Sequence, residues 1–505
     1  MPEYRGDMPV EEFRAWGHRL VDWVAEYLAH VDRYPVLSHV APGDVRRRLA
    51  AAPPEEPEDV ERIFADFQSA VLPGITHWNH PSFFAYFPSV GSGPGILGEL
   101  LTAALNVNGM LWRSAPAATE LEELAVDWLR QMFGLPEAFW GVLEDTASSS
   151  SLCAIAAARD AIADLDVNQE GLPGRREVPR LILYASQEAH SSIDKAARIL
   201  GLGQSNVRRV ATDDDFRMNV GALRGAIEAD LRENARPFCV VATIGTTSTT
   251  SVDPVHEIAD VCADYGLWLH VDAAYAGAAA AVPEKRDLFE GWARADSIVV
   301  NPHKWLFTPM DCSALWTRRP EALRGALSVV PEYLRTKEGD TQSVRNLMDY
   351  GIPLGRRFRA LKLWMVLRTF GREGIVQRLR EHMRWAQELA GWVDDDPDFQ
   401  RMAPAPFSTV CFRAQPHDLR ARAESGEEGD RVEVYLDTLN ECLMNRLNAG
   451  GRLFLSHTKL RDRYVLRFAI GNLRTTEAHV RRAWEEIQAT AADLDDELRI
   501  GALMF

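Results

Sequence analysis

The chain has 505 residues, of which 46% are hydrophobic and 26% charged, a balance typical of a soluble globular enzyme rather than of a fibrous or disordered protein. A chain of this length is expected to form two or three structural units around a shared site, because one simple core rarely grows so large. The formal net charge of −17 argues against a nucleic acid or an anionic membrane as partner, since phosphate binding requires a basic face.

The six cysteines are scattered without the C-x-x-C spacing of a zinc site or the pattern of a disulfide framework. Free thiols in a reducing cytoplasm, and no bound metal, are therefore expected. Residues 1–7 lack the basic and then apolar order of a signal peptide, and no run of about 18 apolar residues occurs. We therefore expect a cytoplasmic protein without a membrane partner.

An aromatic stripe marks the first expected helix, residues 10–30. Apolar side chains recur there at alternating spacings of three and four residues, at Phe13, Trp16, Leu20, Trp23 and Tyr27. So wide an apolar face must be covered, and packing onto the chain's own core is the ordinary way. A proline-rich turn at 51–57 separates this helix from a second one expected at 60–71.

Aromatic side chains crowd residues 77–88, where two prolines argue against a regular helix or strand. Rings held in an irregular segment suit the wall of a pocket, but a plain core segment fits the same residues equally well.

Residues 146–151, Thr-Ala-Ser-Ser-Ser-Ser, open a helix that continues to residue 158. Free backbone N–H groups at a helix N-terminus bind anions such as phosphate. A serine that merely caps the helix is an equally good interpretation. No glycine-rich nucleotide-binding fingerprint occurs at this helix, which argues against a nucleotide.

Two buried strands are expected at 181–185 and 239–244, and each is followed by a polar residue that is a candidate for the functional site. Five residues beyond the first lies His190, whose flat imidazole can stack on a ring or relay a proton, although a capping or core histidine is commoner. The hydroxyl-rich tip of the second strand holds Thr247, which either contacts a ligand or shapes the turn.

Two further apolar runs end in side chains of complementary chemistry. Residues 267–272 end in Asp272, and residues 297–300 lead through an Asn-Pro turn to Lys304. The 32 residues from Asp272 to Lys304 allow one strand-helix-strand crossover, which would bring both side chains to one edge of a parallel sheet. Pyridoxal phosphate requires an amine for an imine and a carboxylate that keeps its pyridine nitrogen protonated. The pair is a candidate site for that cofactor, with a helix cap and a surface lysine as the alternatives.

Strand ends that alternate with helices and converge on one place indicate a doubly wound α/β fold. Residues 329–340 have the polar, charged composition of an exposed loop, and Arg356 and Arg357 either clamp a phosphate or are simply solvated. A boundary is expected at 370–374, before a smaller C-terminal part in which the polar run 422–430 is interpreted as a solvated loop.

Three motifs are specific in combination: Asn-Pro-His-Lys-Trp at 301–305, His-Val-Asp-Ala-Ala-Tyr-Ala-Gly at 270–277, and His-Ser-Ser at 190–192. Together they resemble the pyridoxal-phosphate-dependent aromatic L-amino acid decarboxylase family, of the aspartate-aminotransferase fold type. The similarity runs from about residue 11 to about residue 484. It implies a fold-type I α/β enzyme with a mixed, mostly parallel sheet of the seven-stranded type.

The same resemblance divides the chain into a helical dimerisation segment at 1–90, a large cofactor-binding domain at 91–370 and a small α+β domain at 371–505. In the family, the N-terminal helices embrace the partner subunit. We therefore expect an obligate homodimer with its site at the subunit interface.

The resemblance also implies roles for individual residues. The implied catalytic residues are Lys304, Asp272, His190, His303 and Tyr333. The implied cofactor-binding residues are Lys304, Asp272, His190, Ala147, Ser148, Thr247, Asn301 and His303. The family often has an acidic residue where Ser149 stands. Its loop tyrosine, Tyr333 here, closes over the neighbouring subunit's site to deliver a proton, whereas aldehyde-forming relatives tend to have Phe there and commonly replace His190.

The implied substrate pocket consists of Trp78, Tyr86, Phe87, Pro88, Met110 and Gly355. Met110 stands where animal members have an aromatic ring, and its region serves the neighbouring subunit's pocket in the family. Glycine at position 355 goes with bulky aromatic substrates in the family, whereas serine goes with histidine.

The expected activity is decarboxylation of tryptophan, 5-hydroxytryptophan, DOPA, tyrosine or phenylalanine to the arylalkylamine and CO₂, and the sequence does not rank these five. Two alternatives remain open. An aromatic acetaldehyde synthase shares the whole scaffold but releases peroxide. A cofactor-free interaction protein is a different class, against which the intact Lys304, Asp272 and His190 argue.

Overall fold

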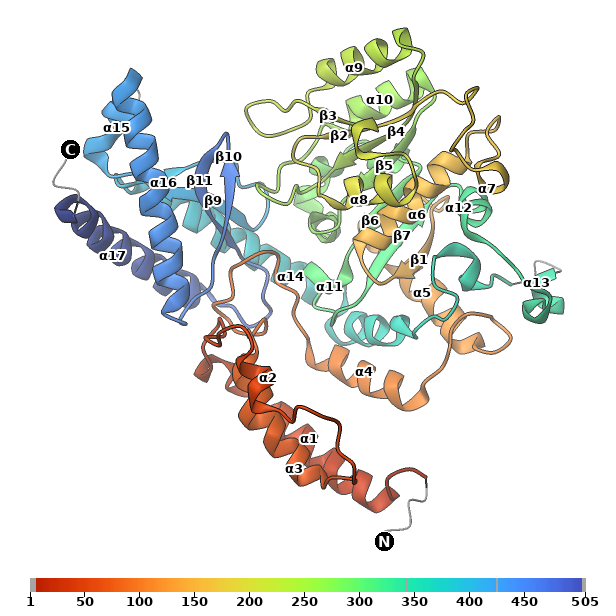
Figure 1. Cartoon of the computed structure of the whole chain (residues 1–505), viewed down its shortest axis with the longest axis horizontal. Helices are drawn as coiled ribbons and strands as arrows, with labels where there is room; N and C mark the ends of the chain where they lie inside the picture. Colours follow the sequence, from red (N-terminus) through yellow and green to blue (C-terminus); the bar gives the residue numbers. More distant parts are fainter. Residues whose placement is uncertain (1–5, 341–343, 424–425, 502–505) are drawn as a thin grey trace.

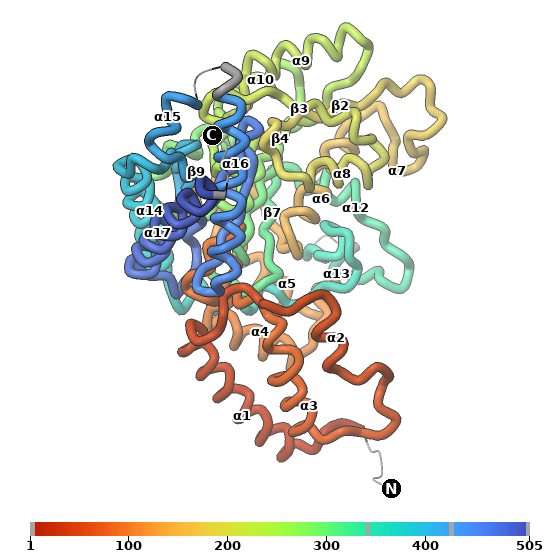
Figure 2. Tube along the Cα trace, turned by 60° about the vertical axis from the view of Figure 1, so that its left-hand side comes forward, coloured from red at the N-terminus to blue at the C-terminus, as the bar shows by residue number. Residues whose placement is uncertain are grey.

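The computed structural model describes residues 6–340, 344–423 and 426–501 of the chain. An N-terminal arm of helices projects from a body that contains a larger and a smaller β-sheet (Figure 1). The arm is formed by α1 (Val10–Ala29), α2 (Asp44–Arg48) and α3 (Val60–Asp66), and it extends away from the body in both views (Figure 2). The next helix along the chain is α4 (Gly93–Leu105). The second expected helix is regular only to Asp66 and continues to Val71 as a π-helical turn, η2 (Phe67–Val71).

The aromatic stripe of α1 packs against α3, where the rings of Trp16 and Trp23 meet the ring of Phe64 edge to face. This contact covers only part of the stripe, and no residue of α1 is buried. Much of the apolar face of the arm is therefore exposed in the single chain.

The larger sheet has seven strands in the order β1-β7-β6-β5-β4-β2-β3. They are β1 (Trp140–Glu144), β2 (Leu181–Ser186), β3 (Val207–Val210), β4 (Arg236–Thr243), β5 (Trp268–Asp272), β6 (Ser297–Val300) and β7 (Ser313–Thr317). Only β7 is antiparallel to its neighbours, so the mixed, mostly parallel sheet predicted from the sequence is confirmed.

Helices cover both faces of this sheet, as a doubly wound fold requires. On one face lie α5 (Pro116–Phe133), α9 (Val220–Arg232) and α10 (Val255–Tyr265), and on the other α6 (Ala147–Asp160), α8 (Ser192–Ile199) and α12 (Pro320–Leu327). In β2, Ile182 and Tyr184 join the first core, whereas Leu183 and Ala185 join the second. Successive side chains of a strand point to opposite faces, so a strand that lies between two cores, as β2 does, is apolar on both faces over residues 181–185.

The crossover from β5 to β6 differs from the single α-helix expected. It consists of three 3₁₀ segments, η5 (Ala276–Ala281), η6 (Pro283–Phe289) and η7 (Trp292–Arg294). All residues of η5 are buried, and a Cβ added to Gly277 would come within 2.4 Å of Val300. Small residues let this segment lie directly on the sheet, where a regular helix with larger side chains would not fit.

The C-terminal part begins in α14 (Arg359–Asp395), which is interrupted at Gly371 by a left-handed backbone angle φ of 61°. Its antiparallel sheet has the order β10-β11-β9-β8. The elements are β8 (Phe399–Arg401), β9 (Thr409–Ala414), β10 (Ser456–Leu460), β11 (Arg463–Ala469), α15 (His417–Ala423), α16 (Gly426–Ala449) and α17 (Glu477–Gly501). The division of the chain at residues 90 and 370 stays a prediction.

The expectation of a loop at 422–430 is wrong, because α15 continues to Ala423 and α16 begins at Gly426; residues 424–425 lie outside the described part. The remaining short elements are η1 (Val31–Arg33), η3 (Leu72–Gly74), α7 (Val167–Glu170), η4 (Gln204–Asn206), α11 (Pro302–Trp305), η8 (Glu332–Leu334), α13 (Lys337–Asp340) and η9 (Leu347–Tyr350).

Among the described residues, no helix combines the length and apolarity needed to cross a lipid bilayer. All six cysteines carry free thiols, and five of them are buried. The described part of the chain contains no group of three or more acidic, His or Cys side chains placed to hold a metal ion.

Candidate active site

The carboxyl ends of β5 and β6 bring Asp272 and Lys304 to the same edge of the large sheet. Asp272 ends β5 and pairs in register with Thr243 of β4 and Val299 of β6. Asn301 follows β6 and donates its N–H to the carbonyl of Ala274 at 2.9 Å, and Lys304 donates its N–H to the carbonyl of Asn301 at 3.0 Å. The turn through α11 therefore returns Lys304 to the segment that follows Asp272.

A cavity of about 210 Å³ lies at this edge. All the residues predicted to bind the cofactor line it, and of the six predicted pocket residues Phe87 lines it as well. They come from the ends of β4, β5 and β6, from the segment after β2 and from the start of α6. Ligands of open α/β sheets bind at such strand ends.

The electrostatics of the cavity favour a reactive amine. Burial lowers the pKa of Lys304 because it penalises the ammonium, and the positive charge of Arg467 acts in the same direction. The carboxylate of Asp272 opposes this shift. Asp272 is buried, and its Oδ1 accepts the N–H of Ala274 at 3.0 Å, which orients the carboxylate.

The two predicted histidines are both held as acceptors at Nδ1. His190 accepts the backbone N–H of Ser192 at 3.2 Å, and His303 accepts that of Cys312 at 3.0 Å. Their remaining ring proton is thereby assigned to Nε2. Burial lowers the pKa of His303 to about 4 and also lowers the pKa of His190, so both rings are neutral near pH 7.

The start of α6 offers an anion site. Ala147 and Ser148 line the cavity, and no side chain within the described ranges caps this helix, so its first N–H groups are free to bind phosphate. Thr243 Oγ1 and Asn301 Oδ1 are buried and lack a hydrogen-bond partner in the described part of the chain. An amine, a carboxylate and an anion-binding helix end in one cavity fit the aldehyde, the pyridine nitrogen and the phosphate of pyridoxal phosphate.

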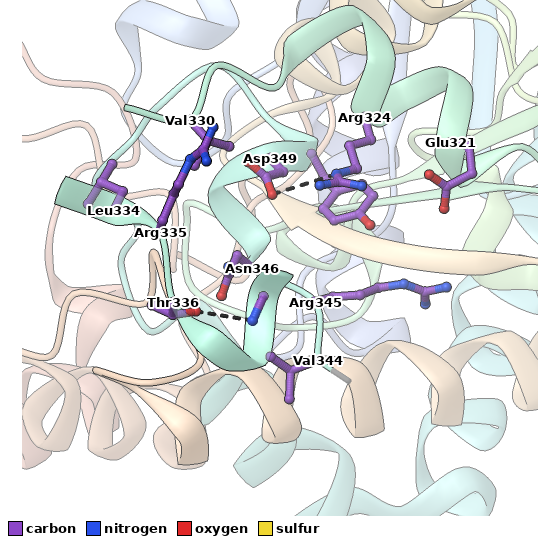
Figure 3. A pocket seen from close by; sticks show the side chains of 12 residues that line it. Glu321, Arg324, Val330, Leu334, Arg335, Thr336, Val344, Arg345, Asn346 and Asp349 are labelled. Carbon is purple, nitrogen blue, oxygen red and sulfur yellow. Dashed lines mark hydrogen bonds and ion pairs between the residues drawn. The ribbon is translucent and has the colours of Figure 1, made fainter. Parts of the chain in front are cut away.

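A larger cavity of about 400 Å³ lies elsewhere, between α12, η8 and η9 (Figure 3). Arg324 points across it toward Asp349, with Nε and Oδ2 3.8 Å apart. None of the residues predicted for the site lines this cavity. It lacks the lysine that the chemistry requires, so the smaller cavity is the candidate active site.

Three predicted residues lie together but outside the chain's own cavity. Tyr333, on η8, is 78% exposed, and its neighbour Leu334 packs in a cluster to which Met110 also belongs. Gly355 lies beside Asn108, whose amide approaches Met110 Sδ at 3.6 Å. A single chain therefore does not bring Tyr333, Met110 and Gly355 to Lys304.

The aromatic segment before α4 sends its side chains in different directions. Phe87 points into the cavity, whereas Tyr86 is exposed and stacks on the partly exposed Trp78 with ring centres 5.9 Å apart. Pro88 packs near Gly471. The backbone turns at Tyr86, whose φ of 52° lies in the left-handed region, and only Phe87 of the predicted rings lines this cavity.

The alternative of a solvated charge is wrong for Arg356 but holds for Arg357, whose side chain is exposed. Arg356 is buried, donates to Glu122 at 2.8 Å and to the carbonyl of Leu143 at 2.5 Å, and therefore holds the structure together instead of binding phosphate. Arg357 pairs with Glu99.

Thr243, Tyr275 and Arg467 are among the residues at or behind the cavity that sequence reasoning missed. Thr243 and Tyr275 line the cavity. Arg467 lies on β11 behind Phe87, with its Cζ 4.3 Å from the centre of that ring. One charged residue inside the apolar run Tyr-Val-Leu-Arg-Phe-Ala-Ile was the signal that could have found it.

Comparisons with known proteins find relatives that match nearly the whole chain. A sequence model described as the pyridoxal-dependent decarboxylase conserved domain matches residues 42–415. A tyrosine decarboxylase of Papaver somniferum is 39% identical over 490 residues, which cover 95% of this chain and 94% of the relative. A phenylacetaldehyde synthase of a Rosa hybrid cultivar is 40% identical over 486 residues, with coverages of 95% and 93%. The crystal structure of Oryza sativa TDC with PLP and tryptamine has a TM-score of 0.90 at 38% identity and covers 97% of this chain and 99% of that one.

Proposed function

The chain belongs to the pyridoxal-dependent decarboxylase family, and we propose that it converts an aromatic L-amino acid to the arylalkylamine and CO₂. The placement of Lys304, Asp272 and the anion-binding start of α6 around one cavity carries this proposal. Phe87 and Tyr275, whose stacked rings form part of the cavity wall, suit an aromatic substrate.

Bound pyridoxal phosphate supplies an electron sink for the electron pair that remains when CO₂ leaves. Lys304 would hold the cofactor through its amine. Asp272 would keep a proton on the pyridine nitrogen, because its buried carboxylate favours the protonated ring. The first turn of α6 would bind the phosphate, and the neutral imidazole of His190 would cover the cofactor ring.

A proton must then return to the substrate's Cα, and Tyr333 is the proposed donor. Its phenol is exposed in the single chain and lies outside the chain's own cavity. We therefore assign it to the cavity of a second subunit, together with Met110 and Gly355.

The exposed apolar surface supports a homodimer built through the N-terminal segment. Large apolar side chains are exposed on α1 and α4, namely Val10, Phe13, Leu20, Val21, Leu97, Leu100, Leu101 and Leu105. Soluble monomers rarely expose apolar surface of this kind in one region, so we assign it to contact with a second copy of the chain. Free thiols favour the proposed cytoplasmic location.

The experiment that tests this function measures CO₂ release from tryptophan, 5-hydroxytryptophan, DOPA, tyrosine and phenylalanine. The amine, the aldehyde and hydrogen peroxide are quantified in the same reactions. We expect CO₂ and amine in equal amounts from at least one of these amino acids. No CO₂ from any of them, despite bound cofactor, would contradict the proposal.

The second candidate function is the aldehyde synthase reaction, because the chain is also similar to a phenylacetaldehyde synthase. Tyr333→Phe tests what separates the two reactions, because without the phenolic O–H the carbanion is left for dioxygen. We expect the variant to release more aldehyde and peroxide and less amine. Tyr265→Phe is the matched control, because it removes a hydroxyl that donates to Glu228 at 3.3 Å on the helix surface, outside the cavity. An unchanged amine product from Tyr333→Phe would remove the proposed role of Tyr333.

A further inference from the structure

Arg467 is a buried cation behind the wall of the active-site cavity. The residue is only 4% exposed, and no carboxylate of the described residues forms an ion pair with it. Its Nε donates to the carbonyl of Ser248 at 2.9 Å, one terminal nitrogen donates to the carbonyl of Tyr86, and the other is buried without a partner. Because burying a charge without a counter-ion destabilises the folded state, packing alone does not explain Arg467.

A stack of flat groups begins at Arg467 and runs along the cavity. The guanidinium Cζ lies 4.3 Å from the centre of the Phe87 ring, and Phe87 stacks on Tyr275 with centres 3.8 Å apart and planes 16° apart. Tyr275 stacks in turn on Trp305, with centres 4.7 Å apart and planes 9° apart. Since Trp305 follows Lys304 directly, the stack connects β11 of the small sheet with both the cavity wall and the reactive lysine.

The same guanidinium is close to the reactive amine. Lys304 Nζ lies 5.2 Å from the centre of the Phe87 ring, so both cations approach one aromatic ring. Burial is the larger cause of the lowered pKa of Lys304, and repulsion by Arg467 adds to it. The neutral amine is the nucleophilic form of lysine, so a lowered pKa favours the reactive form.

We propose that Arg467 is a positioning residue of the active site, which fixes the wall of Phe87 and Tyr275 from behind and places a permanent positive charge beside Lys304. This inference rests on the proposed function, because the wall and the amine matter only in a site that binds pyridoxal phosphate. A guanidinium suits both tasks, since it is planar enough to stack and does not lose its proton. Lysine would keep the charge without the planar stack, and methionine would keep neither.

The test compares Arg467→Lys and Arg467→Met with the native protein, each loaded with pyridoxal phosphate. In the absence of substrate, a pH titration of the visible absorbance of the bound cofactor reports protonation at the Lys304 nitrogen. We expect Arg467→Met to move the midpoint to higher pH, because a repelling charge is lost. Arg467→Lys should leave the midpoint near its native value.

The rate of steady-state decarboxylation shows whether the substitutions displace the wall formed by Phe87 and Tyr275. Both variants are expected to lose about 10- to 100-fold in kcat, the scale on which misplacement of reacting groups acts, with a smaller change in KM. Arg461→Met is the matched control, because Arg461 is exposed, pairs with Asp214 and lies 5.2 Å from the ring of Phe216, away from the cavity. This control should change neither the titration midpoint nor kcat.

A double-mutant cycle shows whether Arg467 acts through Phe87. If it does, Arg467→Lys combined with Phe87→Leu should be no slower than the slower single variant, since both remove the same contact. Losses in kcat that simply multiply would overturn the proposal. Because the cycle uses Arg467→Lys, it tests the role of Arg467 even if Arg467→Met does not fold.

Two other results would overturn the proposal. One is an unchanged titration midpoint in Arg467→Met. The other is a rise in KM alone, which would make Arg467 a direct binding group for the substrate's carboxylate. The spectral titration requires no substrate, so a protein that binds the cofactor but releases no CO₂ would contradict the proposed function and still test Arg467.

Discussion

Lys304 is a half-buried basic side chain in α11, just after β6, and its chemistry depends on its surroundings. Burial and the nearby Arg467 disfavour its ammonium form, whereas Asp272 favours it. The amine therefore gives up its proton more readily than an exposed lysine does, while Asp272 supplies the carboxylate that the cofactor's ring nitrogen requires.

Lys304→Ala tests the central residue. Without the amine, added pyridoxal phosphate has no lysine nitrogen to join at this site, so the visible absorbance of lysine-linked cofactor should be lost. Activity should fall by at least about 10³-fold, as is typical when a covalent group is removed. Absorbance spectra after reconstitution and gel filtration provide the measurement.

Lys459→Ala is the control for this experiment, because Lys459 is exposed on β10 of the small sheet. It should keep both the absorbance and the activity. Native-like absorbance from Lys304→Ala would mean that another lysine binds the cofactor.

At the scale of elements, the site depends on segments that are held together by a buried ion pair. Arg356 joins Glu122 of α5, the carbonyl of Leu143 in β1 and, through its own backbone, the side chain of Asn108. It lies next to Gly355, so it connects the predicted pocket segment with the sheet. Removing one partner leaves the other charge buried and unpaired, which costs more than the pair contributes.

Arg356→Met is therefore expected to lower the free energy of unfolding by about 3 to 5 kcal/mol. Arg357→Met should lower it by no more than about 1 kcal/mol, because Arg357 is exposed and exposed ion pairs are weak. Urea unfolding monitored by circular dichroism compares the two variants. Equal stability of both would show that the Arg356 pair does not hold these segments together.

At the scale of the whole molecule, the uncovered apolar surface and the position of Tyr333 both suit a dimer. Leucines of α4 are exposed, as are Phe13 and Leu20 of α1, and Tyr333 lies outside the chain's own cavity. A second subunit would cover the exposed leucines, and its cavity would receive Tyr333.

Leu97→Asp combined with Leu101→Asp places two charges on one face of α4, because residues four apart share a helix face. Both leucines are exposed, so the change should spare the monomer's fold. We expect the variant to sediment as a monomer and to lose most of its decarboxylase activity, since Tyr333 would no longer reach a partner's cavity. Analytical ultracentrifugation and CO₂ release measure the two effects.

Leu231→Asp is the control, because Leu231 is similarly exposed but lies at the end of α9, on the far side of the body from α4 (Figure 1). It should remain dimeric and active. A monomer with full activity, or a double variant that stays dimeric, would contradict the proposed interface.

Much of the fold and part of the site could be predicted from local patterns. The strands that end at Asp272 and near Lys304, and the helix that begins at Ala147, are apolar or hydroxyl-rich runs whose meaning depends on near neighbours in the sequence. The parallel sheet followed from their alternation with helices. The contacts of Arg356 could not be read in this way, because an arginine's sequence neighbours do not tell whether it meets a carboxylate or water.

The amino-acid sequence by itself determined the strand ends and the chemical groups they carry, because hydrophobic periodicity and residue type act over short distances along the chain. Only the tertiary structure decided that Phe87 rather than Tyr86 faces the cavity, and that Arg467 lies behind it. Phe87 and Arg467 are separated by several hundred residues and belong to different sheets or segments. The segment that holds Phe87 is joined to the end of β11 by the hydrogen bond from the N–H of Ala469 to the carbonyl of Phe84 at 2.9 Å. Such a pairing of distant parts of the chain belongs to the global free-energy minimum, which no local pattern encodes.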